Sequence, residues 1–202
     1  MSEGAVLHAI RQYSLERGSL EIEYLEQYFD EFQEKKTARE ILQRLSARQH
    51  LILIALAPAL DEPEHMVPVA FKVGHELRAL EDEPQLMDLA QRLEGCVQLA
   101  GRRVFYSWIG GTRQEWRGRG HYRALTEQQE EWAHRNGFEE IVVKTKNKFH
   151  AMRATLDHLQ FNVLKFERHP YDNAESKLYL HKLLSPELLR EHRTARHVQI
   201  AA

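Results

Sequence analysis

Short apolar runs, rich in β-branched and aromatic residues, alternate along this chain with longer segments of helical periodicity. Each run is too short for a buried helix and therefore predicts a strand. The first two runs resemble a hairpin, and Gly110-Gly111 is expected to end the third strand. Strands that alternate with helices favour a mixed α/β architecture in one domain. The predicted strands are Leu51–Ala57, Met66–Val73, Val104–Ile109, Ile141–Lys144, Phe161–Phe166 and Leu178–His181.

Apolar residues spaced three and four apart predict the intervening helices. Thr37 is suited to cap one of them, because its hydroxyl can accept a hydrogen bond from the first turn. Ala5–Tyr13 fits a strand or a helix, and periodicity does not decide between them. The predicted helices are Ser19–Leu45 in two parts, with Ile41, Leu42 and Leu45 inward; a short one through Leu86, Leu89, Ala90 and Leu93; Gly120–Asn136; Phe149–Leu159, with Phe149, Met152, Leu156 and Leu159 inward; and one beginning at Ser185-Pro186.

The composition excludes several classes of partner. The 202 residues carry a formal net charge of −2 without a run of Lys and Arg, which argues against nucleic acid. Cys96 is the only cysteine, and the 12 histidines fall in no metal-ligand spacing, so neither a disulfide nor a metal is expected. The longest apolar run, Leu51–Leu60, is about half of what a membrane helix needs. We expect a soluble, cytoplasmic protein without a secretory signal or membrane partner.

The segment from Arg117 to Tyr122 follows a predicted strand and opens a predicted helix. The first N–H groups of a helix have no intrahelical partner and carry a partial positive charge. Glycines before such a helix let the backbone approach an anion closely, which suits a pyrophosphate, and Arg117 and Arg119 add charge there. The alternative is a solvated Gly-Arg turn that only links a strand to a helix.

This segment resembles the cofactor motif of the GNAT superfamily of N-acetyltransferases, Gln/Arg-x-x-Gly-x-Gly/Ala between a strand and a long helix. Arg117 and Gly120 fit the motif, whereas Tyr122 departs from its final small residue. The Tyr122 ring either narrows the approach to the pyrophosphate or turns into the packing of the helix.

The resemblance extends over roughly Leu51–Leu183. Phe71-Lys72-Val73-Gly74-His75-Glu76 and Phe105-Tyr106-Ser107-Trp108-Ile109-Gly110-Gly111 are similar to two strands of one branch of GNAT proteins. Asn147, Met152, Leu159 and Phe161 match the next helix and strand of that branch, and Gln160 replaces its usual glycine.

The resemblance implies a single domain over 1–202, with a mixed, mostly antiparallel central sheet flanked by helices. It implies an N-terminal helical part at 1–50, an insertion at 77–103 between two strands, and a C-terminal helix and tail at 185–202. The fourth and fifth strands of such a sheet splay apart, and the pantetheine arm of acetyl-CoA lies in the gap.

The resemblance also implies the cofactor-binding residues. The strand edge of Ile109, Gly110, Gly111 and Thr112 would bond the pantetheine arm, and its N–H groups would stabilise a developing oxyanion. Asn147 would reach toward the cofactor, or it would instead cap the helix that follows. The pyrophosphate would lie on Arg117, Gly118, Arg119, Gly120, His121 and Tyr122.

Direct transfer needs a base for the acceptor amine. Glu76 and His75 are candidates because they follow a strand beside the expected acceptor site; the alternative is a solvated strand end. His121 is expected to be an exposed histidine at the helix start. Tyr106 and Trp108 alternate along one strand face, so they line either the acceptor cleft or the core.

The tyrosine that protonates the leaving thiolate in many GNAT enzymes aligns with Leu156 and is absent. Tyr106, His158 or Tyr171 is a substitute in principle, and the alternative is water, because a thiol with a pKa of about 8.5 leaves without an acid. Glu76 and Tyr106 are therefore the candidate catalytic residues.

The predicted activity is transfer of an acetyl group from acetyl-CoA to an amine, small-molecule or peptide, by direct attack. A second hypothesis is a regulatory protein that binds acyl-CoA without turnover, and a third is a purely structural domain. Exposed strands at the sheet end are compatible with a homodimer.

Overall fold

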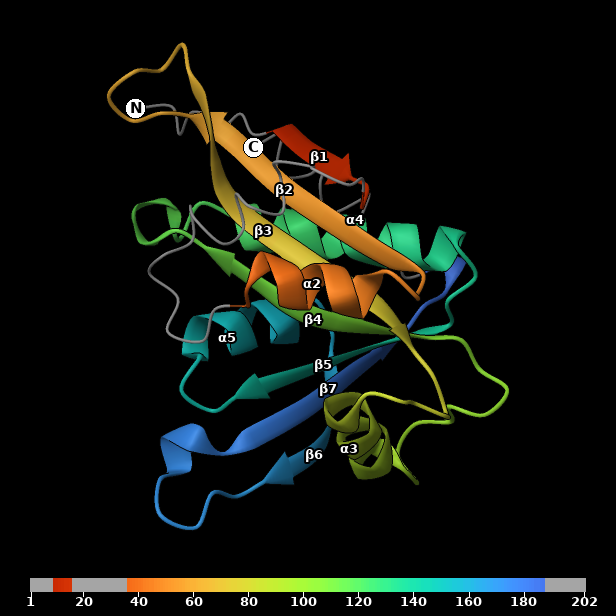
Figure 1. Ribbon diagram of the computed structural model, residues 1–202. Helices are drawn as coiled ribbons and strands as arrows, with labels where there is room; N and C mark the ends of the chain where they lie inside the picture. Colours follow the sequence, from red (N-terminus) through yellow and green to blue (C-terminus); the bar gives the residue numbers. More distant parts are fainter. Residues whose placement is uncertain (1–8, 16–35, 188–202) are drawn as a thin grey trace. The chain divides into compact units, whose positions relative to one another are not determined.

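The computed structural model describes residues 9–15 and 36–187, whose strands form a seven-stranded sheet in the order β1-β2-β3-β4-β5-β7-β6 (Figure 1). β4 and β5 pair in parallel, and the pairs β1–β2, β2–β3, β5–β7 and β6–β7 are antiparallel. This confirms the predicted mixed, mostly antiparallel α/β class. The strands are β1 (Ala9–Tyr13), β2 (His50–Pro58), β3 (Met66–Leu77), β4 (Val104–Thr112), β5 (Glu140–Lys146), β6 (Asn162–Glu167) and β7 (Lys177–Leu183).

Four α-helices and two short 3-10 helices lie in the same described residues. The helices are α2 (Ala38–Leu45), α3 (Pro84–Leu93), α4 (His121–Arg135), α5 (His150–His158), η1 (Gln114–Trp116) and η2 (Asn173–Glu175). The chain divides into two compact units. Within the described residues, unit 1 comprises 9–15, 36–75 and 109–129, and unit 2 comprises 76–108 and 130–187.

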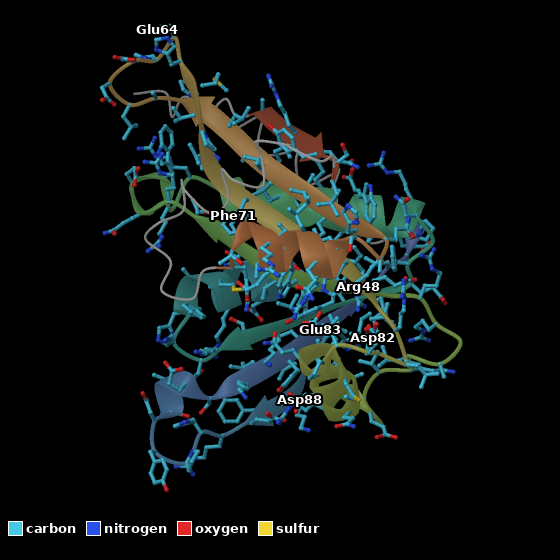
Figure 2. The ribbon with its side chains drawn as sticks, viewed as in Figure 1. Arg48, Glu64, Phe71, Asp82, Glu83 and Asp88 are labelled. Atoms are coloured by element: carbon cyan, nitrogen blue, oxygen red, sulfur yellow. The ribbon has the colours of Figure 1, made fainter. Side chains whose placement is uncertain are left out.

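Unit 1 contains the predicted hairpin of β2 and β3, with Leu53 opposite Lys72. Glu64 lies at the turn between the two strands (Figure 2). Residues 51–55 are all buried, which explains why β2 reads as a continuous apolar run rather than an alternating one. Residues Ala9–Tyr13 pair with β2 as strand β1, which decides the case that periodicity left open.

Helix α2 begins with the predicted cap. Thr37 Oγ1 accepts from the Glu40 N–H (3.2 Å), and Glu40 Oε2 accepts from the Thr37 N–H (2.9 Å), a reciprocal capping box. Hydrogen bonds from Thr37 and then Lys36 lower the pKa of Glu40 to about 2. Ile41 and Leu45 are buried as predicted, but Leu42 is 40% exposed, so the inward face is narrower than expected.

Unit 2 has its own apolar core, built from the predicted short helix α3 and the strands beside it. The leucines of α3 pack against the first half of β4, β5 and β7. The core residues are Leu77, Leu86, Leu89, Leu93, Val97, Val104, Tyr106, Val142 and Tyr179. The predicted insertion therefore supplies part of a hydrophobic core; its role as a separate structural division, like the divisions at 1–50 and 185–202, stays a prediction.

The end of helix α5 differs from its predicted packing. Leu156 and Leu159 are buried, but Phe149 is 48% exposed and lies at the N-cap, before the first residue of the helix. Gln160 follows the helix with φ of 62°, the left-handed region in which glycine is favoured. Two helix-end bonds fix this geometry, Gln160 N–H to Asp157 O (2.8 Å) and Phe161 N–H to Leu156 O (2.9 Å).

Replacing Gln160 by glycine is expected to raise the free energy of unfolding by about 0.5–1 kcal/mol. Glycine removes the steric cost of positive φ, and its extra unfolded-state entropy offsets part of that gain. Urea denaturation measures the change, and Gln160→Ala serves as the control because alanine keeps the steric cost. A glycine variant no more stable than the alanine variant would contradict this account.

Two predicted helical segments lie wholly or mainly outside the described residues. The first part of Ser19–Leu45 falls within 16–35, and only Ser185–Glu187 of the predicted C-terminal helix is described. Among the helices of the described residues, none combines the length and the apolar character that crossing a membrane requires.

Candidate functional site

The end of β4 is shaped by a close approach to β3 within unit 1. Contrary to the prediction, Gly110 and Gly111 do not end the strand, which continues to Thr112. A Cβ at Gly110 would lie 3.0 Å from the Phe71 carbonyl oxygen and 3.4 Å from Lys72 Cγ; Phe71 is labelled on β3 in Figure 2. Glycine within a strand often marks such a backbone approach rather than a turn.

Beyond β4, a short loop folds over a buried tryptophan. Trp116 is 3% exposed, its ring meets the His121 ring edge-on at 6.1 Å, and the Arg119 guanidinium lies 4.9 Å from its centroid. Cation–π and aromatic contacts of this kind stabilise the segment between η1, which ends at Trp116, and the start of α4. His121 is 1% exposed, so the expected exposed histidine at the helix start is wrong: the histidine is part of the loop's packing.

Arg117 and Arg119 are exposed at this loop. Arg117 Nε donates to the Thr112 carbonyl (3.2 Å), which joins the loop to the end of β4. Thr112 Oγ1 is buried, and it has no hydrogen-bond partner within residues 9–15 and 36–187. Buried polar groups normally have a hydrogen-bond partner, so the Thr112 hydroxyl is a candidate for a hydrogen bond to a ligand.

Two glycines set the backbone that enters α4. Gly118 and Gly120 have φ of +76° and +78°. Among residues 9–15 and 36–187, apart from the two chain neighbours of each glycine, no atom lies within 4 Å of a Cβ built on either one. The Gly120 carbonyl accepts from the Ala124 N–H (3.0 Å), the first bond of a 15-residue helix. The backbone is thus open on the Cβ side of both glycines, directly before the positive end of the helix dipole, which favours an anion.

The Tyr122 ring is turned toward β3. The Lys72 ammonium donates to Tyr122 Oη (3.1 Å) and to Thr126 Oγ1 (2.9 Å), and it lies 4.3 Å from the centroid of the Tyr122 ring. Burial raises the pKa of Tyr122, so its phenol stays protonated. Of the two orientations that the sequence left open, the structure has the ring in the packing of the helix.

In unit 2, the parallel pairing of β4 and β5 is short. It runs from Val104 opposite Glu140 to Ser107 opposite Val143, although β5 continues to Lys146. Lys144 is therefore the first β5 residue beyond the last β4 pair. Its cross-strand partner on β7 is Tyr179.

Lys144 shares a sheet face with a polar network beneath α3, the helix on which Figure 2 labels Asp88. Arg92 Nη1 donates to both Glu167 oxygens (2.8 and 2.7 Å), and Tyr179 Oη donates to Glu167 Oε2 (3.1 Å). Burial, and then the charge of Lys177, lower the pKa of Lys144. Within residues 9–15 and 36–187, Lys144 Nζ makes no hydrogen bond or ion pair.

The predicted catalytic residues of unit 2 have protein partners. The Glu76 carboxylate accepts from Arg78 Nε (3.0 Å) and Arg103 Nη2 (3.4 Å). Tyr106 is 6% exposed and packs in the core with the α3 leucines, which is the core alternative stated for it. His75, in unit 1, is fully buried, so a solvated strand end is wrong for it.

Asn147 does not cap α5. Its Oδ1 accepts from Arg153 Nη1 and its Nδ2 donates to the Asn173 carbonyl, while Phe149 is the N-cap without a side-chain bond. Of the proposed substitutes for the missing tyrosine, His158 and Tyr171 are exposed; Leu156, at the aligned position, is buried.

Sequence reasoning assigned no role to Lys72 or Lys144. A lysine inside the apolar run Met66–Val73 was a signal, because a charged residue in a strand buried on both faces needs a special partner. Nothing local marked Lys144, since its position depends on where the pairing of two distant strands ends. Within the part of the chain that the structure describes, no three His, Cys, Asp or Glu side chains gather as metal ligands.

No protein-family model matches the sequence, and no curated protein matches it. Solved structures do match. A chain of the NatC complex bound to Gag peptide and CoA is 16% identical with a TM-score of 0.64, the match covering 88% of this chain and 99% of that one. NAA60 of Arabidopsis thaliana in complex with acetyl-CoA is 13% identical with a TM-score of 0.62, over 88% and 99%.

A bacterial structure gives the same result. The ribosomal-protein-S18-alanine N-acetyltransferase of Escherichia coli is 15% identical with a TM-score of 0.56, covering 88% of this chain and 95% of that one. At these identities the likeness concerns the fold, which this chain shares with all three over most of its length.

Proposed function

We propose that this chain, which has the fold of the GNAT N-acetyltransferases, moves an acetyl group from acetyl-CoA to an amine by direct attack. One observation carries the proposal: the loop between β4 and the 15-residue helix α4 contains two positive-φ glycines, and within the described residues the space on their Cβ side is open. Such a loop before a helix N-terminus suits a pyrophosphate.

The residues present fit acetyl-CoA. The amides at the start of α4, with Arg117 and Arg119, would hold the pyrophosphate, and a Cβ at Gly118 or Gly120 would enter the open space beside it. The edge of β4 from Ile109 to Thr112 would hold the pantetheine arm, and the Thr112 hydroxyl, without a partner in the described part of the chain, supports this assignment. Asn147, whose amide bonds Arg153 and Asn173, would act there only if it exchanged these partners.

Acetyl-CoA supplies the acetyl group as a reactive thioester. A new C–N bond forms to the acceptor nitrogen, the C–S bond breaks, and the ammonium proton must pass to a base. A lysine-like amine has a pKa of about 10.4, so proton removal is needed near neutral pH. The departing thiol has a pKa of about 8.5, so water is sufficient to protonate it without a tyrosine.

We propose a peptide α-amine or lysine amine as the first acceptor class to test. Two proteins of the same fold support this choice: the NatC complex was solved with a bound Gag peptide, and the Escherichia coli enzyme is named as an N-acetyltransferase of ribosomal-protein-S18 alanine. A small-molecule amine is the alternative, and a panel with both classes distinguishes them.

Two measurements test the function. Acetyl-CoA at 100 times its Kd is expected to raise the free energy of unfolding by about 2.7 kcal/mol. Release of free thiol over the acceptor panel then reports turnover. Absence of stabilisation would contradict cofactor binding. Stabilisation without thiol release would favour the second hypothesis, a regulatory protein that binds acyl-CoA without turnover. Leu156 supports that hypothesis, because it is buried and stands where many GNAT enzymes have the tyrosine that protonates the thiolate.

Lys144→Met is expected to lower kcat about 100-fold while the Kd of acetyl-CoA stays unchanged, if Lys144 accepts the amine proton. Burial and Lys177 lower the pKa of Lys144, so its neutral form is available at lower pH than for an ordinary lysine. The rate should therefore rise with pH through this lowered pKa, and the rise should be lost in the variant. A pH–rate profile of kcat measures both effects.

Lys177→Met is the matched control. It removes the neighbouring positive charge and keeps Lys144, so the pKa of Lys144 should increase and the rising limb should move to higher pH. An unchanged kcat and profile in Lys144→Met would return the role of base to Glu76 or to water.

A further inference from the structure

Lys72 is a lysine with no exposed surface on strand β3 of unit 1. Its neighbours along the strand, Phe71 and Val73, are buried apolar residues. Its ammonium donates to two hydroxyls on α4, Tyr122 Oη (3.1 Å) and Thr126 Oγ1 (2.9 Å). Burying an ammonium is costly unless its donors are satisfied, and an apolar side chain would pack here without that cost.

The contact fixes the position of one ring. Tyr122 is the second residue of α4, so its side chain projects from the turn whose amides are open to an anion. The hydroxyl bond and the cation–π contact at 4.3 Å together hold the ring on Lys72. In the described part of the chain, apart from their chain neighbours, no atom lies within 4 Å of a Cβ position at Gly118 or Gly120.

A large ring in this turn would otherwise compete with a ligand for the loop. Tyr122 stands where the cofactor motif that this segment resembles has a small residue, so an open loop requires that the ring be held away from it. Thr126 lies one helical turn later, and its own Oγ1 also donates to the Tyr122 carbonyl (2.8 Å), which stiffens the first turns of α4.

We propose that Lys72 is a positioning residue that holds the Tyr122 ring against β3, so that the loop at Gly118–Gly120 stays open to a diphosphate. The inference rests on the proposed acetyl-CoA function, and it concerns a residue that would not touch the ligand. Lys72 acts on binding only through Tyr122.

The test is a double-mutant cycle on CoA binding, measured by isothermal titration calorimetry on the full chain. Lys72→Met is expected to raise the Kd of CoA about 10-fold, because the ring is released toward the loop. Adding Tyr122→Ala to Lys72→Met removes the ring, so the double variant should bind CoA more tightly than Lys72→Met and about as tightly as Tyr122→Ala alone. A merely structural role for Lys72 gives no such rescue.

Thr126→Val is the matched control, since it deletes the second hydroxyl partner of Lys72 and leaves the ring anchored. Its Kd should stay within about 2-fold of the wild type, and a loss equal to that of Lys72→Met would overturn the inference. Should Lys72→Met fail to fold, Tyr122→Phe removes the same hydrogen bond from its other end and should raise the Kd about 3-fold; an unchanged Kd would overturn the inference.

The wild-type titration separates the two proposals. If the wild type does not bind CoA, the proposed function fails first. If the wild type binds CoA and Lys72→Met binds equally well, or if Tyr122→Ala does not rescue the loss, only the role of Lys72 is wrong.

Discussion

Gly120→Asp is expected to abolish CoA binding at concentrations that saturate the wild type, with the fold retained. The new carboxylate would stand in the open space before α4, against the diphosphate that the helix amides are proposed to hold. Like charges brought together at a binding site cost several kcal/mol, so the Kd should rise by at least about 100-fold. The stabilisation by CoA in thermal unfolding should disappear accordingly.

Gly120→Asn is the matched control for this variant. Asparagine and aspartate have nearly the same size and tolerate positive φ about equally, so both should destabilise the free protein similarly at φ of +78°. Only the aspartate adds charge. Equal CoA affinity in the two variants would show that the anion does not bind at this loop, and the site would have to lie elsewhere.

Lys182→Met is expected to lower the free energy of unfolding by about 3–5 kcal/mol. Lys182 and Glu130 form an ion pair in unit 2, with side chains 2% and 0% exposed and Nζ 2.6 Å from Oε2. Removing the ammonium leaves a carboxylate in a site that water does not reach. Urea denaturation monitored by tryptophan fluorescence measures the loss.

The double variant Lys182→Met/Glu130→Leu tests the cause of that loss. Replacing both partners of a buried pair by apolar residues of similar volume is often neutral, so the double variant should recover most of the stability. Glu130→Leu alone should be destabilised, because it leaves the ammonium without this partner. A double variant no more stable than Lys182→Met would show that packing, rather than the loss of this ion pair, causes the destabilisation.

The local elements followed from the sequence because their causes are local. The capping box of Thr37 and Glu40 lies within four residues. After α4, Gly137 with φ of +79° directly follows Asn136, where the helix was predicted to end. The strand–loop–helix order around Arg117–Tyr122 was likewise evident, because strand propensity, glycine and helical periodicity each act over a few residues.

The wrong predictions from the sequence concern contacts between residues of different secondary-structure elements. Gly110 was predicted to end the strand, but glycine is needed there because a Cβ would lie too close to the Phe71 carbonyl oxygen on the neighbouring strand. Leu42 has the right spacing for an inward face, yet it is 40% exposed within the described residues, since periodicity defines a face and only a neighbour covers it. Phe149 is 48% exposed and lies just before α5, at its N-cap. Asn147 had the right place for a cap, but Arg153 and the Asn173 carbonyl bond its amide.

The sequence by itself determined the secondary structure of most of the described chain, the α/β class and the loop proposed to bind the diphosphate. Only the tertiary structure decided the direction of the Tyr122 ring, the burial of His75 and His121, and the place of Lys144 beyond the last β4–β5 pair. Dihedral preferences and caps act between near neighbours in the chain. The bond from Lys72 to Tyr122 joins residues 50 positions apart, so it exists only once the strand and the helix have packed.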